Sequence, residues 1–340
     1  MARVVFPAEW HSQSGVQIAF PHSETDWFPI LDEVKACYLA FSKEILKREK
    51  LLIVSPESEG LEQFFTAEER RNLIVAKAKT NDTWARDHGG LPVFIDGLPT
   101  VLDFGFNAWG LKFAANHDNL ITQELFRLGV FRPEVQYRNH LNFVLEGGSV
   151  ESDGKGTLLT TSRCLLAPNR NQPMQRREIE RFLLKTFGLK RILWLNHGYL
   201  AGDDTDNHVD TLARFCDERT IAYVQCTDKN DTHFAELQAM EKELQAFLTE
   251  EGKPYKLIAL PMADEVVFEG SRLPATYANF LIVNGAVLLP FYASAKDEMA
   301  RGQLQKAFLD REIIGIDCRP LIKQHGSLHC VTMQLPDGFL

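Results

Sequence analysis

Three stretches of the chain share a common opening: GVQIAFPHS (15–23), GTLLTTSRCLLAPNR (156–170) and GAVLLPFYAS (285–294). Each is typical of a buried strand followed by a turn, and units of strand, helix and returning strand begin near residues 15, 91, 156, 220 and 285. The offsets are 76, 65, 64 and 65 residues, and a near-constant period of this length indicates a repeat architecture. A single doubly wound parallel sheet is the alternative, because it also alternates strands and helices. No GxGxxG or phosphate-loop motif follows the first strand, so we favour a ring in which each unit covers its neighbour's strand edge.

Hydrophobic periodicity predicts the elements of these units. Apolar residues at steps of three and four predict helices over 30–48, 173–187, 232–249 and 296–309, with a weaker helix over 117–129. Short β-rich runs bounded by Gly, Pro and Asn predict the strands, at 16–20, 51–55, 91–95, 143–148, 157–161, 191–195, 221–225, 255–260, 286–291, 312–316 and 330–335. We therefore expect an α/β fold that forms one domain over residues 1–340.

Composition excludes several classes of protein. The chain has 340 residues, of which 45% are hydrophobic, and its 23 Phe and 5 Trp can bury enough apolar surface to exclude disorder. No apolar run approaches the ~20 residues of a membrane-spanning helix, and the N-terminus turns polar too early for a secretory signal. The net charge of −9 disfavours nucleic-acid binding. Six cysteines without a CxxC pair indicate free thiols in a reducing cytoplasm rather than a structural zinc site.

Polar clusters occur at the junctions between the units. They span 81–90, 145–156, 203–215, 277–285 and 325–336, and a closed ring would place the last of these before the first unit. If the units are related by rotation, equivalent junctions meet on the axis of the ring. This convergence would gather Asp87, Glu146, His208, Asp210, Asn279 and Cys330 at one place.

The junction before the fourth unit carries polar residues at every second position, Asp204, Asp206, His208 and Asp210. In an extended chain this spacing puts all four on one face. The row fits a metal site, since Asp and His are good ligands for zinc and related ions, or a histidine held by an aspartate for general acid/base catalysis. A solvated loop is the third interpretation. An EF-hand is excluded, because Val209 stands where the loop needs glycine.

The other junction residues are ordinary when taken singly. Asp87 suits a turn, Glu146 precedes two glycines that mark a bulge or a close backbone approach, and a lone cysteine such as Cys330 is usually a small buried residue. A thiol accompanied by histidine and carboxylates is, however, the expected set for cysteine catalysis. Trp84 and Trp109 suit packing or a wall that contacts a cation.

Together the motifs NDTWARD (81–87), DFGFNAWG (103–110), LEGGSVESDGKGT (145–157), DDTDNHVDTLARF (203–215), YANFLIVNGAVLLP (277–290) and SLHCVTMQLP (327–336) resemble the agmatine deiminases. These belong to the bacterial-type peptidylarginine deiminase family of the guanidine-modifying superfamily. The resemblance runs from about residue 10 to the end and implies a five-bladed α/β propeller, in agreement with the period. Asn207 and Gly90 depart from the family pattern, which commonly has Gly and Pro there.

The resemblance also implies roles for the junction residues. Cys330 matches the nucleophile, His208 the acid/base, and Asp87 and Asp210 the carboxylates that bind the guanidinium. Further expected substrate-binding residues are Glu146, Asn279, Trp84 and Trp109. The expected reaction is hydrolysis of agmatine, without metal or cofactor.

The expected partner is a small cationic guanidine, with no nucleic acid and no membrane, while a homodimer stays open. Arginine, free or in a peptide, is the alternative substrate of the same site. A metal-dependent hydrolase and a non-catalytic guanidine-binding module are the alternatives from other classes.

Overall fold

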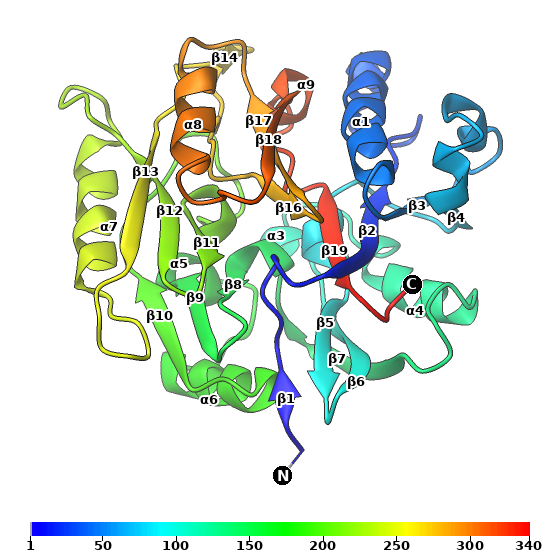
Figure 1. Cartoon of the computed structure of the whole chain (residues 1–340), viewed down its shortest axis with the longest axis horizontal. Helices are drawn as coiled ribbons and strands as arrows, with labels where there is room; N and C mark the ends of the chain where they lie inside the picture. Colours follow the sequence, from blue (N-terminus) through cyan, green and yellow to red (C-terminus); the bar gives the residue numbers. More distant parts are fainter. Residues whose placement is uncertain (1) are drawn as a thin grey trace.

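Five sheets with one shared strand pattern make up most of the structure (Figure 1), a computed structural model that describes residues 2–340. In each sheet an inner strand pairs antiparallel with a middle strand, and the middle strand pairs parallel with the strand that returns after a connection. The sheets follow one another around a central region in the order of the chain. The arrangement is propeller-like, although within residues 2–340 no strand pairing joins one sheet to the next.

The strands of the five sheets have the following bounds. The first sheet contains β19 (Thr332–Pro336), β2 (Gln13–Ala19), β3 (Lys50–Ser55) and β4 (Leu73–Lys77), and the second contains β1 (Val4–Val5), β5 (Leu91–Ile95), β6 (Leu98–Gly105) and β7 (Gln136–Val144). The third contains β8 (Val150–Ser152), β9 (Thr157–Thr161) and β10 (Arg191–Leu195), and the fourth β11 (Ala213–Asp217), β12 (Thr220–Gln225) and β13 (Lys256–Pro261). The fifth contains β16 (Leu281–Val283), β17 (Ala286–Phe291) and β18 (Glu312–Asp317), and a separate two-stranded ribbon is formed by β14 (Val267–Phe268) and β15 (Ser271–Arg272).

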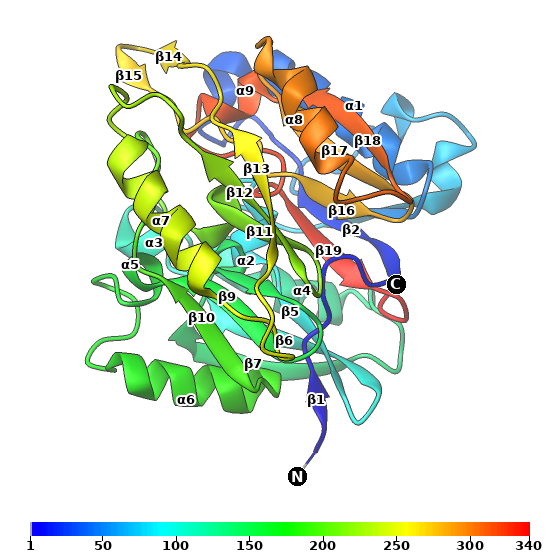
Figure 2. The same cartoon turned by 60° about the vertical axis from the view of Figure 1, so that its left-hand side comes forward.

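Helices lie on the outer side of the ring (Figures 1 and 2). The longer ones are α1 (Leu31–Leu46), α4 (Ile121–Arg127), α6 (Arg176–Phe187), α7 (Phe234–Ala246) and α8 (Lys296–Leu304). Four of them contact both their own sheet and the sheet before it: α1 packs on β3 and β18, α6 on β10 and β1, α7 on β12 and β10, and α8 on β18 and β13. Each of these helices therefore covers part of its neighbour's edge, as the ring hypothesis predicted.

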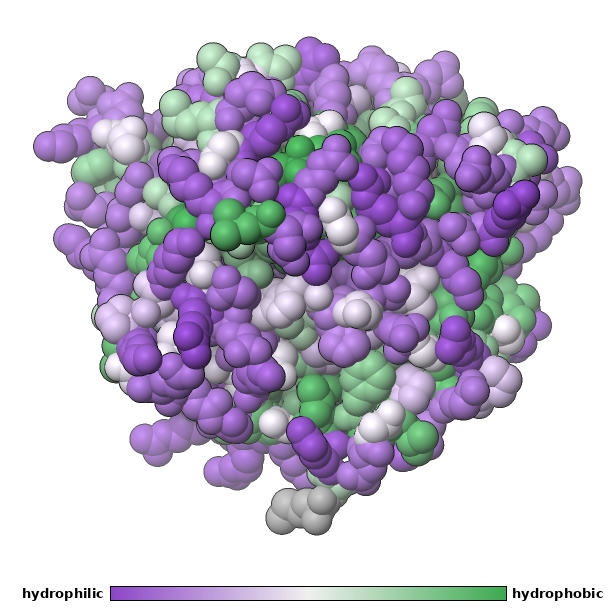
Figure 3. Space-filling view, viewed as in Figure 1, coloured by the Kyte–Doolittle hydropathy of each residue, from purple (hydrophilic) through white to green (hydrophobic). Residues whose placement is uncertain are grey.

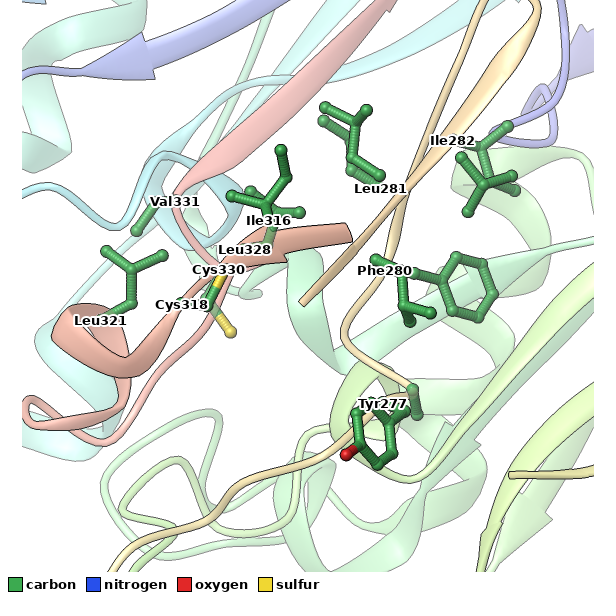
Figure 4. Packing of buried hydrophobic residues seen from close by; sticks show 14 of the residues in the cluster. Tyr277, Phe280, Leu281, Ile282, Ile316, Cys318, Leu321, Leu328, Cys330 and Val331 are labelled. Atoms are coloured by element: carbon green, nitrogen blue, oxygen red, sulfur yellow. The ribbon is translucent and has the colours of Figure 1, made fainter. Parts of the chain in front are cut away.

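The two ends of the chain close the ring. The C-terminal strand β19 is the inner strand of the first sheet and pairs antiparallel with β2, with Thr332 opposite Ile18. The last polar cluster, 325–336, therefore does precede the first unit, as predicted. Around the axis, buried apolar residues pack between the sheets; Figure 4 shows Leu328 and Val331 beside Cys330, with Leu281 and Phe280 of the same cluster farther from it.

Several predictions about individual elements need correction. The strand expected at 143–148 is wrong: β7 ends at Val144, and the residues from Gly147 to Ser149 form a short 3₁₀ helix, because this junction turns toward the axis. The middle strand of the second unit is β6. The predicted strand at 91–95 is β5, the inner strand of that unit. Strands β4, β6, β11 and β16 were not predicted.

Two further expectations concern the surface and the thiols. The face in Figure 3 is mainly hydrophilic, with small scattered apolar groups. Over residues 2–340 none of the helices combines the length and the apolar character needed to cross a bilayer. All six cysteines are free thiols, and all are buried.

Candidate active site

The five predicted junctions meet at the axis of the ring, each immediately before the inner strand of a sheet. Asp87 lies in the short helix α2 (Ala85–His88) before β5, and Glu146 caps the 3₁₀ helix Gly147–Ser149 before β8. His208 caps, and Asp210 lies within, the 3₁₀ helix Val209–Thr211 before β11. Asn279 precedes β16 and Cys330 precedes β19. The structure thus brings together the junction residues that the sequence predicted.

Hydrogen bonds connect the junctions in a closed cycle. The junction before the first unit (325–336) is linked to the junction before the second (81–90) by a hydrogen bond from the Arg86 amide to the Cys330 carbonyl (3.1 Å). The Gly148 amide, in the junction before the third unit (145–156), donates to Asp87 Oδ1 at 3.0 Å. Thr161 Oγ1, in the third sheet, donates to the Asn207 carbonyl of the fourth junction at 2.7 Å. The cycle is completed by Asn279 Nδ2 to the Asp210 carbonyl (3.3 Å) and by the His329 amide to the Asn279 carbonyl (3.2 Å). Backbone groups buried at the axis are satisfied in this way, which fixes the functional side chains that they carry.

Gly148 is the point where three of these side chains come closest. A Cβ atom at this position would lie 2.6 Å from His208 Nδ1, 2.9 Å from Asp87 Oδ1 and 3.0 Å from Asp210 Oδ2. His208 Nδ1 itself lies 3.5 Å from Asp87 Oδ1. The pair of glycines after Glu146 therefore does mark a close backbone approach, as the sequence indicated, and the approach is to the candidate acid/base and both candidate carboxylates.

Cys330 is held by Asn279. The Asn279 Oδ1 atom accepts hydrogen bonds from the main-chain amides of His329 (2.9 Å) and Cys330 (3.3 Å), and it lies 3.4 Å from Cys330 Sγ. The side chain of Asn279 thus fixes the strand end that carries the thiol, and Cys330 is 4% exposed at the bottom of a cavity.

Two tryptophans form a wall of the site. Trp109 Nε1 donates to Asp87 Oδ2 at 2.9 Å, and the Trp109 and Trp84 rings pack edge to face with centroids 6.3 Å apart. Ala108 and Trp109 both have left-handed backbone conformations, with φ of 51° and 56°. Such strain in residues with a Cβ persists where the surroundings over-determine it and often accompanies function. Here it turns the Trp109 indole toward Asp87.

Glu146 is neutralised by a cation. Its carboxylate is fully buried and accepts from Arg170 Nε at 3.0 and 3.3 Å. Arg170 Nη1 also bonds Asp206 Oδ2 at 2.7 Å, and Lys112 Nζ lies 3.2 Å from the same oxygen. A chain of alternating charges therefore links the buried Glu146 to the partly exposed Asp206.

The expected single face of Asp204, Asp206, His208 and Asp210 is wrong. Asp206 and Asn207 adopt left-handed conformations (φ of 66° and 65°), so the segment turns instead of extending. This turn sends Asp206 toward Arg170, while His208 and Asp210 face the axis. Asparagine tolerates this conformation better than most residues, which explains how Asn207 can stand where the family pattern of the resemblance implies glycine.

A cavity of about 190 Å³ opens beside these groups. Trp84, Asp87, Trp109, Phe113 and Cys330 line it, together with Asp26, Asp82, Asp204, Thr205, Gln324, His325 and Gly326. Among these lining residues, all within the described chain, there are four aspartates and neither a lysine nor an arginine. The cavity therefore favours a cationic ligand with an apolar portion.

Burial and neighbouring charges shift the pKa values in the site. Burial raises the pKa of Asp87 to about 6, although the nearby His208 lowers it. Burial lowers the pKa of His208, but the charges of Asp87, Cys164 and Asp210 outweigh this effect and hold it well above its usual range. Burial, and then the charges of Asp210 and Asp87, raise the pKa of the Cys330 thiol well above its usual range. Without a ligand, Cys330 is therefore a thiol and His208 is protonated at neutral pH.

Two groups of side chains have the composition of a metal site. The ligand atoms of Glu146, Cys164 and His208 lie within 4.8 Å of one another, and so do those of Glu9, Glu151 and His329. Each group already holds a buried guanidinium on its carboxylates, Arg170 in the first and Arg214 in the second. A metal ion would have to displace that cation, so neither group fits one. The row at 204–210, for which a metal site was one of three interpretations, does not share one face.

Several residues of the site were missed by the sequence analysis. Glu9, Cys164 and Arg170 come from outside the junctions, whereas Arg214 lies near the end of the junction 203–215 and was not singled out there. His329 is adjacent to Cys330, and it is fully buried between two carboxylates.

Comparison with known proteins agrees with this geometry. The sequence profile of the Porphyromonas-type peptidyl-arginine deiminase family matches residues 5–336. The agmatine deiminase of Pseudomonas aeruginosa is 31% identical over 357 residues, covering 97% of this chain and 95% of the relative.

Two solved structures are also similar. A crystal structure from Porphyromonas gingivalis with a provisional arginine deiminase assignment is 52% identical, with a TM-score of 0.96 over 99% of this chain and all of that one. A serine-for-cysteine variant of the C. jejuni agmatine deiminase with substrate bound is 38% identical, with a TM-score of 0.92 over all of this chain and 98% of that one. The chain belongs to the Porphyromonas-type peptidyl-arginine deiminase family.

Proposed function

We propose that the protein hydrolyses the guanidinium group of agmatine, giving N-carbamoylputrescine and ammonia, through a covalent intermediate on Cys330. The observation that carries the proposal is the cavity in which a buried thiol lies among four aspartates and two indoles, without a lysine or arginine among its lining residues. The agmatine deiminases among its full-length relatives support it.

Asp87 and Asp210 are the groups that bind the guanidinium. His329 occupies Asp210 Oδ2, while Asp210 Oδ1 is buried and has no hydrogen-bond partner among residues 2–340, so a ligand can supply one. Asp87 accepts one bond on each oxygen, and a carboxylate can accept about four in all. Paired N–H bonds to the two carboxylates would fix the planar group and orient its central carbon.

Substrate binding prepares the nucleophile. The negative charges around Cys330 hold it as a thiol in the free protein, and a bound guanidinium offsets those charges and favours the thiolate. The thiolate attacks the central carbon to give a tetrahedral adduct. His208, whose ring nitrogens have no hydrogen-bond partner within the described part of the chain, protonates the departing ammonia and leaves an S-alkylthiouronium. His208 then takes a proton from water, which attacks the same carbon and releases the ureido product and the thiol.

The charges that line the cavity also favour agmatine over arginine. Agmatine has a second cation at its far end, and Asp26, Asp82 and Asp204 line the same cavity as Asp87. The α-carboxylate of arginine would meet these carboxylates without a basic partner, which is unfavourable. The provisional assignment of the P. gingivalis structure is the observation in favour of arginine as the second candidate.

A screen of ammonia release tests the proposal. The purified protein is given agmatine, free arginine and an arginyl peptide at equal concentrations, with Cys330→Ala as the control for catalysis by the thiol. We expect release from agmatine alone. Release from arginine instead would establish the second candidate, and guanidine binding without release would establish a binding module. Loss of activity in chelator with full activity in Cys330→Ala would establish a metal-dependent hydrolase.

A further inference from the structure

We propose that His329, next to the nucleophile in sequence, is a positioning residue that holds Asp210 from behind and leaves one oxygen of that carboxylate free for the guanidinium. The proposal goes beyond the reaction scheme, although it rests on the proposed function for its kinetic test. The imidazole bridges two buried carboxylates: Nδ1 lies 2.7 Å from Asp210 Oδ2 and Nε2 lies 2.8 Å from Glu9 Oε2.

The hydrogen bonds define the state of the ring. Burial raises the pKa of Asp210, but the hydrogen bond and charge of His329, together with the charges of His208 and Arg214, outweigh this effect, and the net shift is downward. Burial likewise raises the pKa of Glu9, while Arg214 and then His329 bring it far below its usual range. Both carboxylates are therefore ionised and can only accept. The bridge thus requires an N–H on each ring nitrogen of His329, and the geometry places both nitrogens within hydrogen-bond distance of a carboxylate oxygen.

Glu9 is itself anchored and cannot follow the ring. Its Oε2 accepts from Arg214 Nη2 at 2.6 Å and its Oε1 from the Ile282 amide at 2.7 Å. Arg214 is fully buried, forms an ion pair with Glu151 and donates to the Phe280 carbonyl at 2.6 Å. The bridge thus ties Asp210 to the β11 and β16 region through rigid partners.

This arrangement explains why only one oxygen of Asp210 is engaged. His329 occupies Oδ2, and the Asp210 backbone carbonyl is held by Asn279 Nδ2, so the carboxylate has little freedom to rotate. Oδ1 remains buried and unpartnered. An unpaired buried acceptor is costly, and a guanidinium N–H is the kind of donor that removes this cost. The ionisable groups that face the bridge are Glu9, Arg86, Asp87, Glu151, His208, Arg214 and Cys330.

Two amide variants separate the two ends of the bridge. In His329→Asn the amide nitrogen takes about the place of Nδ1 and can still donate to Asp210. In His329→Gln it takes about the place of Nε2 and donates to Glu9 only. We expect His329→Gln to lower kcat/KM for agmatine about 10- to 100-fold, which is the effect of losing a hydrogen bond to a charged group. His329→Asn should retain clearly more activity.

The pH profile distinguishes positioning from a merely structural role. Both variants remove the positive charge that lowers the pKa of Asp210, so that pKa rises toward the value of about 6 that Asp87 has. Asp87 alone sets the acid limb of kcat/KM in the unsubstituted protein; in the variants Asp210 adds a second protonation, and the limb becomes steeper and moves to higher pH. His233→Asn is the matched control, because His233 is also buried and its Nδ1 lies 2.6 Å from Asp231, away from Asp210. It should leave the acid limb in place. The proposal would be overturned if His329→Asn and His329→Gln lost the same share of kcat/KM and the acid limb moved in neither variant.

A measurement without turnover completes the test. In ¹⁵N-histidine NMR at pH 7 the His208→Gln protein, which lacks the other strongly charged ring, should still show one imidazole with both nitrogens protonated. The signal of His329 is identified as the one that is missing from the spectrum of His329→Asn. If that signal is from a neutral tautomer, the bridge is refuted. If the variants at position 329 do not fold, the spectrum of the His208→Gln protein alone decides the test. A spectrum without a doubly protonated imidazole refutes the bridge. Failure of the proposed function would show separately, as an unsubstituted protein that releases no ammonia from agmatine.

Discussion

Replacement of Gly148 by alanine tests whether the geometry at the axis is the source of activity. The added Cβ would lie 2.6 Å from His208 Nδ1, and ordinary contact begins at 3.4 Å, so the imidazole or the backbone must move by about 0.8 Å. The same methyl lies 2.9 Å from Asp87 Oδ1 and 3.0 Å from Asp210 Oδ2, which leaves no direction of relief within the site. A displacement of about 1 Å in a catalytic group can cost 10²-fold, and overpacking typically costs about 1–3 kcal/mol of stability. We expect Gly148→Ala to lower kcat for agmatine about 100-fold or more while the protein stays folded.

The assay is steady-state ammonia release together with thermal unfolding. Gly302→Ala is the matched control, since Gly302 lies within α8 and nothing lies within 4 Å of its added Cβ. Alanine there should raise stability by about 1 kcal/mol and leave kcat unchanged. A Gly148→Ala protein with unchanged kcat would refute the reasoning, because the three proposed catalytic groups would then tolerate a methyl where the structure leaves no room.

Further predictions follow from the same site. Cys330→Ala should abolish ammonia release, whereas Cys164→Ala should retain part of it, and mass spectrometry should detect an amidino adduct on the Cys330 peptide alone. Since the pKa of Asp87 is about 6 in the free protein and binding needs the carboxylate, kcat/KM should fall as the pH drops through about 6. Asp204→Asn should raise KM for agmatine several-fold, the scale of a lost ionic contact, and reduce the preference over arginine in a competition assay. EDTA should leave the rate unchanged, because Arg170 occupies the carboxylate that a metal ion would use; a lost rate restored by zinc would contradict this.

The ring could be predicted because its repeats are visible in the chain. The openings at 15, 156 and 285 each carry an apolar run and a turn, and their spacing needs no knowledge of contacts. The placement of the last junction followed from closure, and β19 does pair with β2. Strands such as β16 (Leu281–Val283) were missed because three residues are too few to show a period.

The site could be predicted only where its residues lie in the junctions. Cys330 and His208 are there, and convergence on the axis assigned them correctly to one place. Asp206 was misassigned because alternation implies one face only in an extended chain, and the positive φ of Asp206 and Asn207 breaks it. Arg170 and Glu9 reach the axis from a loop and from the N-terminal segment, and no local pattern in the sequence distinguishes them from surface charges.

The two carboxylates that we propose bind the guanidinium differ in their surroundings, and this difference bears on selectivity. Asp210 is paired with His329, which keeps it ionised. Asp87 has only neutral donors and a nearby His208, so burial raises its pKa from 3.8 to about 6. A shift of one pKa unit corresponds to about 1.4 kcal/mol, so the ionised Asp87 lowers the free energy of unfolding of the ligand-free protein by about 3 kcal/mol. This loss of stability is absent below pH 3.8 and fully present above pH 6. A bound cation offsets it, whereas a neutral urea, such as the product, does not. The cavity should therefore hold the guanidinium more tightly than the ureido group, which favours release of the product after each turnover.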